Sequence, residues 1–349
     1  MARPPRATKK LGDDTMQKNI VRKATELNLS KLHNTNLKLS NICLGAGNFG
    51  DKTTEVSALE ILDEFYAIGG NFVDTANIYC KWVPGLGNSS ERIIGKWLKS
   101  RGRYKDMIIA TKGGHYDLIS PDISRVNKRE VEIDLDESLL TLGLDQIDFY
   151  WLHRDNESLP IEEIIGFMEG FVKDGKIRYY GASNYRLERM KQAHEYAASS
   201  GLQGFSALSN QWSLAKANIN KNVVTDLVSM TDEYHRWHVE TKMPLVPYTS
   251  TANGFFEKMH SGRLSPEMEM AFVNEENKKM YKLLLEMKEK YDVSIHALSL
   301  AFLMNHPFDV IPVCGVNTVE QLRDIALVGD IVTKAAPQIE DYIKTQIVF

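Results

Sequence analysis

Four polar residues of different types follow short apolar runs along the chain, and their side chains could share acid–base chemistry. Asp74 ends the apolar run in NFVDTANIYC, and Tyr79 stands five positions further on. Lys112 ends MIIATK, and His153 ends FYWLH. Each residue alone suits a structural role, such as a turn aspartate or a lysine that reaches solvent. Together they supply a weak acid, a cation, a carboxylate and an imidazole, which are the parts of a proton-donating system.

Tyrosine is the candidate acid of this group. Its ordinary pKa of about 10 makes it a reluctant proton donor at neutral pH. A nearby lysine ammonium is expected to lower that pKa, and an aspartate keeps the lysine charged and in place. A histidine can orient the reacting oxygen by a hydrogen bond. Tyr79 would then give a proton to a carbonyl oxygen, and because no side chain donates hydride, the chemistry requires a nicotinamide or a flavin.

Apolar strands alternate with amphipathic helices along the chain, and this order predicts where the four residues lie. Strands are predicted at 40–47, 71–76, 106–112, 146–153, 177–183, 205–211, 244–249 and 309–315. Helices are predicted at 55–70, 89–102, 128–144, 160–175, 186–201, 223–240, 275–292, 294–306 and 319–329. Repeated βα units with apolar strands indicate a parallel sheet, and about eight such units predict an α/β fold of the (β/α)₈ TIM-barrel type. The active site of such a barrel lies at the carboxyl ends of its strands.

An open doubly wound sheet is the alternative architecture. Such a sheet usually carries a GxGxxG turn that leads from its first strand into a helix. Here GAGNFG follows the first predicted strand, but no helix is predicted to begin there, so the barrel is preferred. No linker rich in proline, glycine or serine divides the chain. We therefore predict one barrel domain over 29–349 with decorated βα loops, after a flexible basic arm over 1–28.

The composition excludes several functional classes. Hydrophobic residues make up 43% of the chain and charged residues 25%, as in ordinary globular proteins. A formal net charge of −4 gives no electrostatic footprint for nucleic acid, and no run approaches the ~18 apolar residues of a membrane span. Three scattered cysteines suggest a reducing compartment, so a cytoplasmic protein is predicted. His235 and His238 have a spacing that could hold a metal, but no third ligand accompanies them and no metal is predicted.

Five motifs in order and spacing make the sequence resemble the aldo-keto reductase superfamily over about 37–327. They are FVDTANIY, IIATK, LGLDQIDFYWLH, GKIRYYGASNY and PYTSTANG. The resemblance implies a (β/α)₈ barrel that carries out reversible, NAD(P)H-dependent reduction of aldehydes and ketones. It also implies that Asp74, Tyr79, Lys112 and His153 are the catalytic residues, with Tyr79 as the proton donor.

A cofactor site is implied by the same resemblance. Ser183, Asn184 and Gln211 would hydrogen-bond the nicotinamide carboxamide, and Tyr248 would stack on the nicotinamide ring. The segment GVNTVEQLRD would hold the adenosine phosphate at the start of the last helix, where a helix N-terminus favours an anion. The other matching positions are Gly45, Ala46 and Asp74 beside the nicotinamide, and Gly315, Asn317, Gln321 and Asp324 around the adenosine.

Two positions depart from the family pattern. Asn317 stands where members that favour NADP usually carry arginine or lysine, and asparagine adds no charge. NADP(H) is expected from the family, and NAD(H) remains the alternative. Gly47 stands where many members place a bulky residue, which would leave more room near the nicotinamide.

The substrate is predicted from the residues that would surround the pocket. Trp82, His115, Arg154 and Trp212 are the candidates, together with the two residues that follow Arg154. Polar groups beside aromatic rings suit a hydroxyl-rich molecule, because sites that hydrogen-bond hydroxyls reject analogues that lack them. A small-molecule carbonyl substrate is therefore predicted, and a sugar or sugar-derived carbonyl is the hypothesis.

Two other classes of function stay open at the level of sequence. Some relatives of this family serve as cofactor-sensing subunits of membrane channels, and such a protein would bind nucleotide with little turnover. A metal-dependent barrel isomerase would need clustered ligands, for which only Asp74 and His153 are obvious candidates. The family includes monomers, dimers and larger assemblies, so no oligomeric state is predicted.

Overall fold

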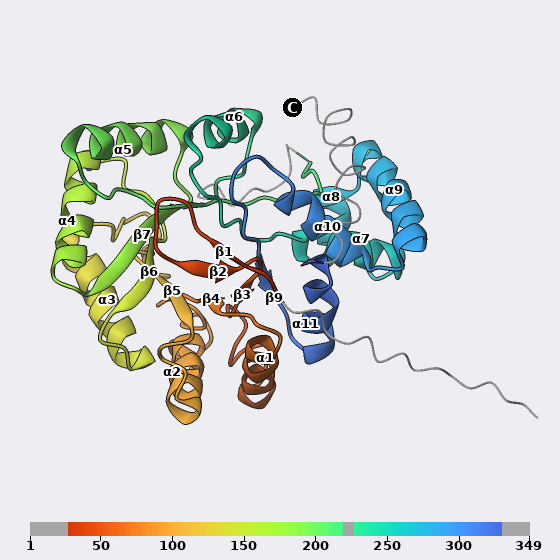
Figure 1. Cartoon of the computed structure of the whole chain (residues 1–349), viewed down its shortest axis with the longest axis horizontal. Helices are drawn as coiled ribbons and strands as arrows, with labels where there is room; N and C mark the ends of the chain where they lie inside the picture. Colours follow the sequence, from red (N-terminus) through yellow and green to blue (C-terminus); the bar gives the residue numbers. More distant parts are fainter. Residues whose placement is uncertain (1–26, 219–226, 330–349) are drawn as a thin grey trace, which may run out of the picture.

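A computed structural model describes residues 27–218 and 227–329 of the chain, and its centre is a curled parallel sheet (Figure 1). Seven strands follow the order β8-β7-β6-β5-β4-β3-β9, and every neighbouring pair is parallel. These strands are β3 (Cys43–Gly45), β4 (Phe72–Asp74), β5 (Ile108–Gly113), β6 (Ile147–Leu152), β7 (Ile177–Ser183), β8 (Leu208–Ser209) and β9 (Val313–Gly315).

An eighth segment, at 244–248, closes this sheet into a barrel. Leu245 forms parallel bridges to Leu208 on one side and to Val310 on the other. The Val246 N–H donates to Leu208 O at 2.8 Å, and the Ile311 N–H donates to Leu245 O at 2.9 Å. The segment thus joins β8 to the strand that ends in β9, and the predicted (β/α)₈ barrel is confirmed.

Helices surround the barrel (Figure 1). They are α1 (Glu55–Ala67), α2 (Ser89–Arg101), α3 (Lys128–Leu142), α4 (Ile161–Lys173), α5 (Leu187–Ser200), α6 (Asp232–Thr241), the 3₁₀ helix η1 (Ala252–Gly254), α7 (Phe255–His260), α8 (Pro266–Phe272), α9 (Glu275–Tyr291), α10 (Ile295–Met304) and α11 (Val319–Ala326). Most of these elements match the predicted ranges, but α7 and α8 were not predicted. Both are short, and an apolar period is hard to read over so few residues.

Local chemistry explains where several of these helices begin and end. The side chains of Thr54, Asn127 and Thr318 each accept a backbone N–H of the first turn, at the starts of α1, α3 and α11. Such caps satisfy donors that would otherwise lack a partner. Gly102 and Gly143 follow α2 and α3 with φ of 63° and 68°, a left-handed conformation that glycine adopts without steric cost.

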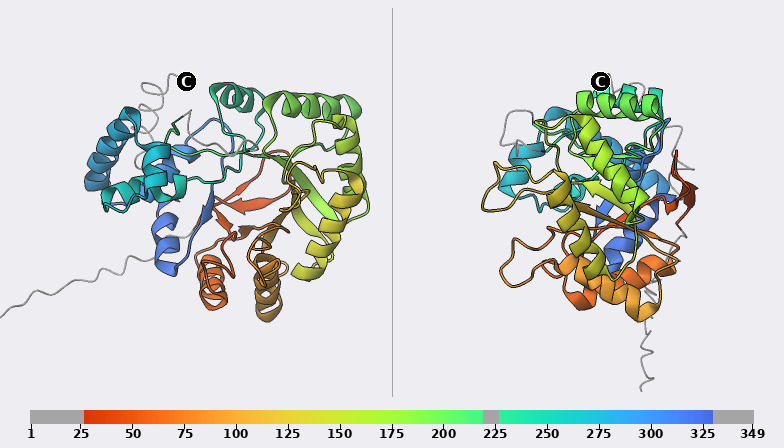
Figure 2. Two further views of the ribbon diagram at one scale, coloured as in Figure 1. Left: turned by 180° about the vertical axis from the view of Figure 1, so that it is seen from behind. Right: turned by 90° about the vertical axis from the view of Figure 1, so that its left-hand side faces the viewer.

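One end of the barrel is closed by a hairpin that the sequence did not predict. Strands β1 (Leu29–Lys31) and β2 (Lys38–Ser40) pair antiparallel. Leu32, Leu37 and Leu39 are buried in the same apolar cluster as residues from the barrel interior. Figure 2 shows the hairpin on one side of the barrel and the long βα loops on the opposite side. The carboxyl ends of the strands are therefore the open end.

The predicted helix at 223–240 is wrong in the part that the structure describes before Asp232. There the chain is extended, because Gln211 N donates to Val228 O at 2.8 Å and Met230 N donates to Gln211 O at 2.9 Å. Helix α6 begins only at Asp232. Pairing with the end of β8 thus outweighs the helical apolar spacing of this segment.

The predicted N-terminal arm falls almost wholly on residues outside the described ranges, so the division into arm and domain stays a prediction. The first described residue, Leu27, is buried, and its N–H donates to Ile68 O at 2.8 Å. Among the described residues, no helix is long and apolar enough to cross a bilayer. In the same ranges no group of three or more His, Cys, Asp and Glu side chains could hold a metal ion.

Candidate active site

A buried ion pair joins the carboxyl ends of the neighbouring strands β4 and β5. Asp74 is the last residue of β4, and Lys112 lies two residues beyond its register partner Ala110 on β5. Each residue is only 4% exposed. The Lys112 ammonium donates to the Asp74 carboxylate and, at 2.8 Å, to Thr75 O. Because water scarcely screens a buried pair, these contacts fix the position of the ammonium.

Tyr79 shares the same ammonium. Lys112 Nζ lies 3.2 Å from the Tyr79 hydroxyl oxygen. Burial raises the pKa of Tyr79, and this effect outweighs the lowering by the Lys112 charge. Lys112 thus acts in the predicted direction, but the net shift is upward because of burial. The Tyr79 hydroxyl therefore stays protonated at neutral pH.

The charges of the pair follow from the same contacts. Burial lowers the pKa of Lys112, but Asp74 and Tyr79 together raise it more, and the net shift is upward. Burial raises the pKa of Asp74, while the charge and hydrogen bond of Lys112 oppose that shift. Lys112 therefore remains an ammonium at neutral pH, which is the state that can stabilise a tyrosinate.

His153 lies beside Tyr79, directly after β6. Its ring centroid is 5.9 Å from that of Tyr79, with the two rings nearly perpendicular. Burial, and then the charge of Arg154 and the neighbouring His115, lower the pKa of His153 well below its ordinary value. Its Nδ1 is buried and has no hydrogen-bond partner among the described residues. A neutral imidazole in this place can accept or donate one hydrogen bond to a bound molecule.

Aromatic side chains of the barrel interior lie beneath these residues. Trp151 is in register with Lys112 across β5 and β6 and is fully buried. Its ring centroid lies 4.4 Å from that of Phe149. Neither Trp151 nor the carbonyl of Thr75 was predicted as part of the site. The motif FYWLH contains this tryptophan, but the sequence alone does not show that Trp151 is in register with Lys112 on the neighbouring strand.

The residues expected at the nicotinamide lie together at the ends of β7, β8 and the eighth segment. The Tyr248 hydroxyl donates to Asn184 Oδ1 at 2.5 Å, and Ser183 Oγ donates to Ser209 O at 3.0 Å. Gln211 and Tyr248 form a parallel bridge. The sequence motifs thus meet in space, and their amide and hydroxyl groups suit a carboxamide that both donates and accepts hydrogen bonds.

Glycines stand at the end of β3, where a side chain would meet its neighbours. Gly45 pairs with Gly315 in register, and a Cβ on Gly45 would come within 2.8 Å of Val313 Cγ1. A Cβ on Gly47 would lie 3.6 Å from the Tyr79 ring. The adjacent Ala46 donates its N–H to Asp74 O at 2.9 Å. A bulky residue at Gly47 would therefore crowd the tyrosine, and the glycine leaves that space open.

The residues expected at the adenosine lie where β9 leads into α11. Thr53 Oγ1 donates to Asn317 Oδ1 at 2.8 Å, which ties the loop after β3 to this turn. The Asn317 N–H donates to Gln321 Oε1 at 2.8 Å. Asp324 Oδ2 lies 3.3 Å from His296 Nδ1. The helix N-terminus offers backbone donors for an anion, but Asn317 brings no positive charge to it.

A cavity of about 390 Å³ opens beside the site, at the carboxyl ends of β5, β6 and β7. Polar side chains predominate in its lining, which is formed by Gly114, Tyr116, Pro121, Asp122, Ser124, Arg154, Asp155, Glu157, Asn184, Arg186 and Val228. The cavity is bounded by neighbours of Lys112 and His153 rather than by those residues themselves. Its position suits the body of a substrate whose reactive group reaches toward Tyr79.

Three of the four predicted pocket residues lie near the catalytic candidates. We name these candidates, Asp74, Tyr79, Lys112 and His153, the acid group. Trp82 is 45% exposed, and its ring meets the Tyr79 ring edge-on at 6.0 Å. The His115 ring lies 4.8 Å from that of His153. Arg154 Nη1 donates to His153 O at 2.8 Å.

Trp212, the fourth predicted pocket residue, packs in a different aromatic cluster. Its ring centroid lies 4.7 Å from that of His306 and 6.3 Å from that of Phe302. Phe302 belongs to α10, outside the acid group. No ring contact joins Trp212 to Tyr79 among the described residues, and a pocket role for Trp212 stays a prediction.

Comparison with known proteins identifies the family. Residues 41–342 match the model of the Aldo/keto reductase family. The chain belongs to the aldo/keto reductase family. This aldo/keto reductase is therefore an oxidoreductase of carbonyl compounds, from a family that generally uses NAD(P)H.

Several curated relatives share about a quarter of its residues. Norsolorinic acid reductase stcV of Emericella nidulans is 27% identical over 82% of this chain and 73% of its own length. Aryl-alcohol dehydrogenase [NADP(+)] of Phanerodontia chrysosporium is 26% identical over 82% of this chain and 77% of its own length. The uncharacterized oxidoreductase YrpG of Bacillus subtilis is 26% identical over 84% of this chain and 88% of its own length.

We expect the buried imidazole of His153 to stay neutral at pH 6.5, because its pKa lies well below that ordinary value. The unfolded chain binds a proton there near pH 6.5 and the folded chain does not, so this residue reduces stability as the pH falls below that value. Imidazole ¹⁵N shifts, assigned with His153→Gln, measure the ionisation. A titration step near pH 6.5 for His153 would contradict the arrangement.

Proposed function

We propose that this aldo/keto reductase reduces the carbonyl group of a small polar aldehyde or ketone with NADPH, and that Tyr79 is the proton donor. The shared Lys112 ammonium, which contacts both Asp74 and Tyr79, is the observation that carries the proposal. This contact supports a tyrosine that is protonated before the reaction and whose tyrosinate is stabilised after the proton has left.

Each residue of the acid group has a separate role in the proposed reaction. The Tyr79 hydroxyl gives its proton to the carbonyl oxygen of the substrate, and the resulting tyrosinate is stabilised by the Lys112 ammonium. Asp74 keeps that ammonium in place and charged. His153, neutral and with an unpartnered Nδ1 among the described residues, hydrogen-bonds the substrate oxygen and orients it.

Residues at three strand ends would hold the nicotinamide. Ser183, Asn184 and Gln211 offer donors and acceptors to its carboxamide, and Tyr248 offers a ring face. A nicotinamide bound there supplies the hydride that no side chain can supply. The chain's own contribution is to bind, to orient and to donate the proton.

The adenosine end would lie along the turn into α11. Gly315 is exposed where β9 ends, and Gln321 and Asp324 follow on α11, whereas Gly45 and Ala46 at the end of β3 would lie beside the nicotinamide. NADP is proposed because it is common in the family and appears in the name of one relative. NAD is the competitor, because Asn317 offers a 2′-phosphate no positive charge.

A hydroxyl-rich carbonyl, such as a sugar or sugar derivative, is the proposed substrate class. The cavity beside the site is lined mainly by polar side chains, including Asp122, Ser124, Arg154 and Arg186. An aromatic carbonyl is the second candidate, since one relative is named an aryl-alcohol dehydrogenase and the Trp82 ring lies against the Tyr79 ring.

Replacing Tyr79 with phenylalanine removes the acid and little else. We expect Tyr79→Phe to lower kcat/KM by roughly 10²-fold or more, the usual worth of general acid catalysis. NADPH binding, followed by quenching of protein fluorescence, should be unchanged. Tyr179→Phe is the matched control, because the Tyr179 hydroxyl contacts Asn36 in the hairpin at the other end of the barrel.

Two outcomes of that experiment would count against the proposal. Full activity in Tyr79→Phe would show that another group donates the proton. Tight NADPH binding by the wild-type protein without turnover of any carbonyl would favour the nucleotide-sensing role known among relatives of the family.

A matched pair of aldehydes tests the substrate class. Erythrose and butanal have the same carbon skeleton, and only erythrose carries hydroxyl groups on it. We expect erythrose to be reduced with the higher kcat/KM, because polar groups of the cavity are left unpaired by butanal. NADPH and NADH are compared in parallel, with benzaldehyde as the aromatic arm. Much faster turnover of butanal or benzaldehyde would refute the sugar hypothesis.

A further inference from the structure

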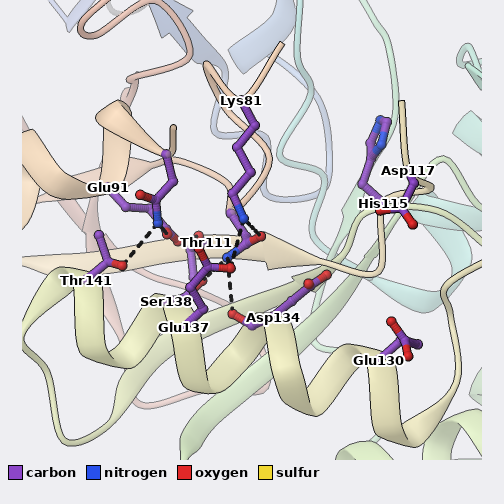
Figure 3. Close-up of polar contacts among 12 residues, drawn as sticks. Lys81, Glu91, Thr111, His115, Asp117, Glu130, Asp134, Glu137, Ser138 and Thr141 are labelled. Atoms are coloured by element: carbon purple, nitrogen blue, oxygen red, sulfur yellow. Dashed lines mark hydrogen bonds and ion pairs between the residues drawn. The ribbon is translucent and has the colours of Figure 1, made fainter. Parts of the chain in front are cut away.

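The loop that carries Tyr79, residues 75–82, is anchored to helix α3 by two side chains on either side of the tyrosine. Lys81 Nζ donates to Glu137 Oε2 at 2.8 Å and to Asn77 Oδ1 at 2.7 Å. Asn77 Nδ2 donates to the same Glu137 oxygen at 3.1 Å. Figure 3 shows Lys81 reaching down to Glu137 on the helix. Asn77, Lys81 and Glu137 thus form a closed triangle, which we name the α3 brace.

The brace is linked to the acid group through the backbone. The Asn77 N–H donates to Lys112 O at 3.0 Å, so one residue contacts both α3 and the strand of the catalytic lysine. The Tyr79 N–H donates to Ala76 O, and the Lys81 N–H donates to Ile78 O, both at 3.0 Å. These turns hold Tyr79 between the two anchored side chains. A shift of Lys81 or Asn77 therefore moves the tyrosine relative to Lys112.

The charges in the brace are set by its contacts. Burial raises the pKa of Glu137, but hydrogen bonds from Lys81 and Asn77 outweigh it, and the net shift is downward. Glu137 is thus ionised at neutral pH. The Lys81 and Glu137 side chains are 28% and 42% exposed, and ion pairs so accessible to water contribute little to stability. The pair therefore matters little for folding free energy.

The position of Tyr79 matters more, because a catalytic rate depends more strongly on geometry than the free energy of unfolding does. A misplacement of about 1 Å in a catalytic group can cost roughly 10²-fold in rate. The brace restrains the loop that, in the proposed mechanism, places the Tyr79 hydroxyl against the Lys112 ammonium.

Helix α3 also holds the second loop beside the site. Asp134 Oδ2 accepts the Gly114 N–H at 2.8 Å, and Arg125 Nη2 donates to Asp134 Oδ1 at 2.7 Å. Arg125 Nη1 donates to His115 O at 3.1 Å. The loop of Tyr79 and the loop of His115 are thus fastened to successive turns of one helix.

We propose that Lys81 is a positioning residue for Tyr79 and acts through Asn77 and Glu137 on α3. The inference rests on the proposed function, since it assigns Lys81 to the placement of the proposed proton donor. Lys81 does not contact the Lys112 ammonium, and its effect is transmitted by the loop.

The test compares Lys81→Met with Lys176→Met. Lys176 is 27% exposed and pairs with Glu132 at 3.0 Å and Asp136 at 2.7 Å on the same helix, but its ion pairs do not involve the loop of Tyr79. We expect Lys81→Met to lower kcat about 10-fold with KM for the carbonyl unchanged, a fraction of what a misplaced catalytic group can lose. Lys176→Met should leave kcat unchanged, and both variants should lose similar, small amounts of Tm. Lys81→Arg, which keeps the charge, should restore much of the lost kcat.

A second readout does not depend on turnover. Hydrogen–deuterium exchange of peptides that cover residues 75–82 should become faster in Lys81→Met and in Glu137→Gln, and should stay unchanged in Lys176→Met. In kcat, Lys81→Met and Glu137→Gln should be non-additive, because both break one triangle.

The possible results separate the two claims. Unchanged kcat or unchanged exchange in Lys81→Met would overturn the positioning role. A wild-type protein that reduces no carbonyl would overturn the proposed function, while the exchange data would still decide whether the brace holds the loop.

Discussion

The site depends on one buried ammonium. Lys112 is surrounded by an anion, a backbone carbonyl and a phenol, contributed by Asp74, Thr75 and Tyr79. A lysine is buried in its charged form only where partners repay the loss of water, and here the ion pair does so. In the proposed mechanism, the same charge stabilises the tyrosinate that forms when Tyr79 gives up its proton. Burial alone would only make the Tyr79 phenol a weaker acid, so the proposed role of Tyr79 depends on Lys112.

The barrel supplies the rigidity that this arrangement needs. Parallel register sets Asp74 and Lys112 at the same end of neighbouring strands, and the buried Trp151 lies beneath them. The hairpin closes the opposite end (Figure 2). Tyr79 lies five residues beyond the end of β4, on a loop, and the α3 brace restrains that loop where no strand does (Figure 3). The Tyr79 hydroxyl therefore lies between rigid strand ends and a loop that side-chain contacts hold in place.

The sequence predicted what is local or repeated. Alternating apolar runs gave the barrel, and residues at strand ends gave the acid group, because strand ends converge in a parallel barrel. Contacts between distant segments could not be read in this way. The pairing of Lys81 with Glu137 spans 56 positions and depends on how α3 packs. A sequence does not show the depth of burial, so it could not reveal that burial raises the pKa of Tyr79 more than Lys112 lowers it. The contact of Trp212 with His306 likewise joins segments far apart in the chain.

The most direct measurement of the central claim is kcat in a variant that lacks the buried pair. Lys112→Met alone would leave Asp74 buried and unpaired, at a cost of about 3–5 kcal/mol, so Asp74→Asn/Lys112→Met is the better choice. Its fold is checked by circular dichroism and its NADPH binding by fluorescence. If the ammonium enables Tyr79 to donate its proton, kcat should fall by roughly 10²-fold or more with binding retained. A folded, NADPH-binding variant with wild-type kcat would contradict the account.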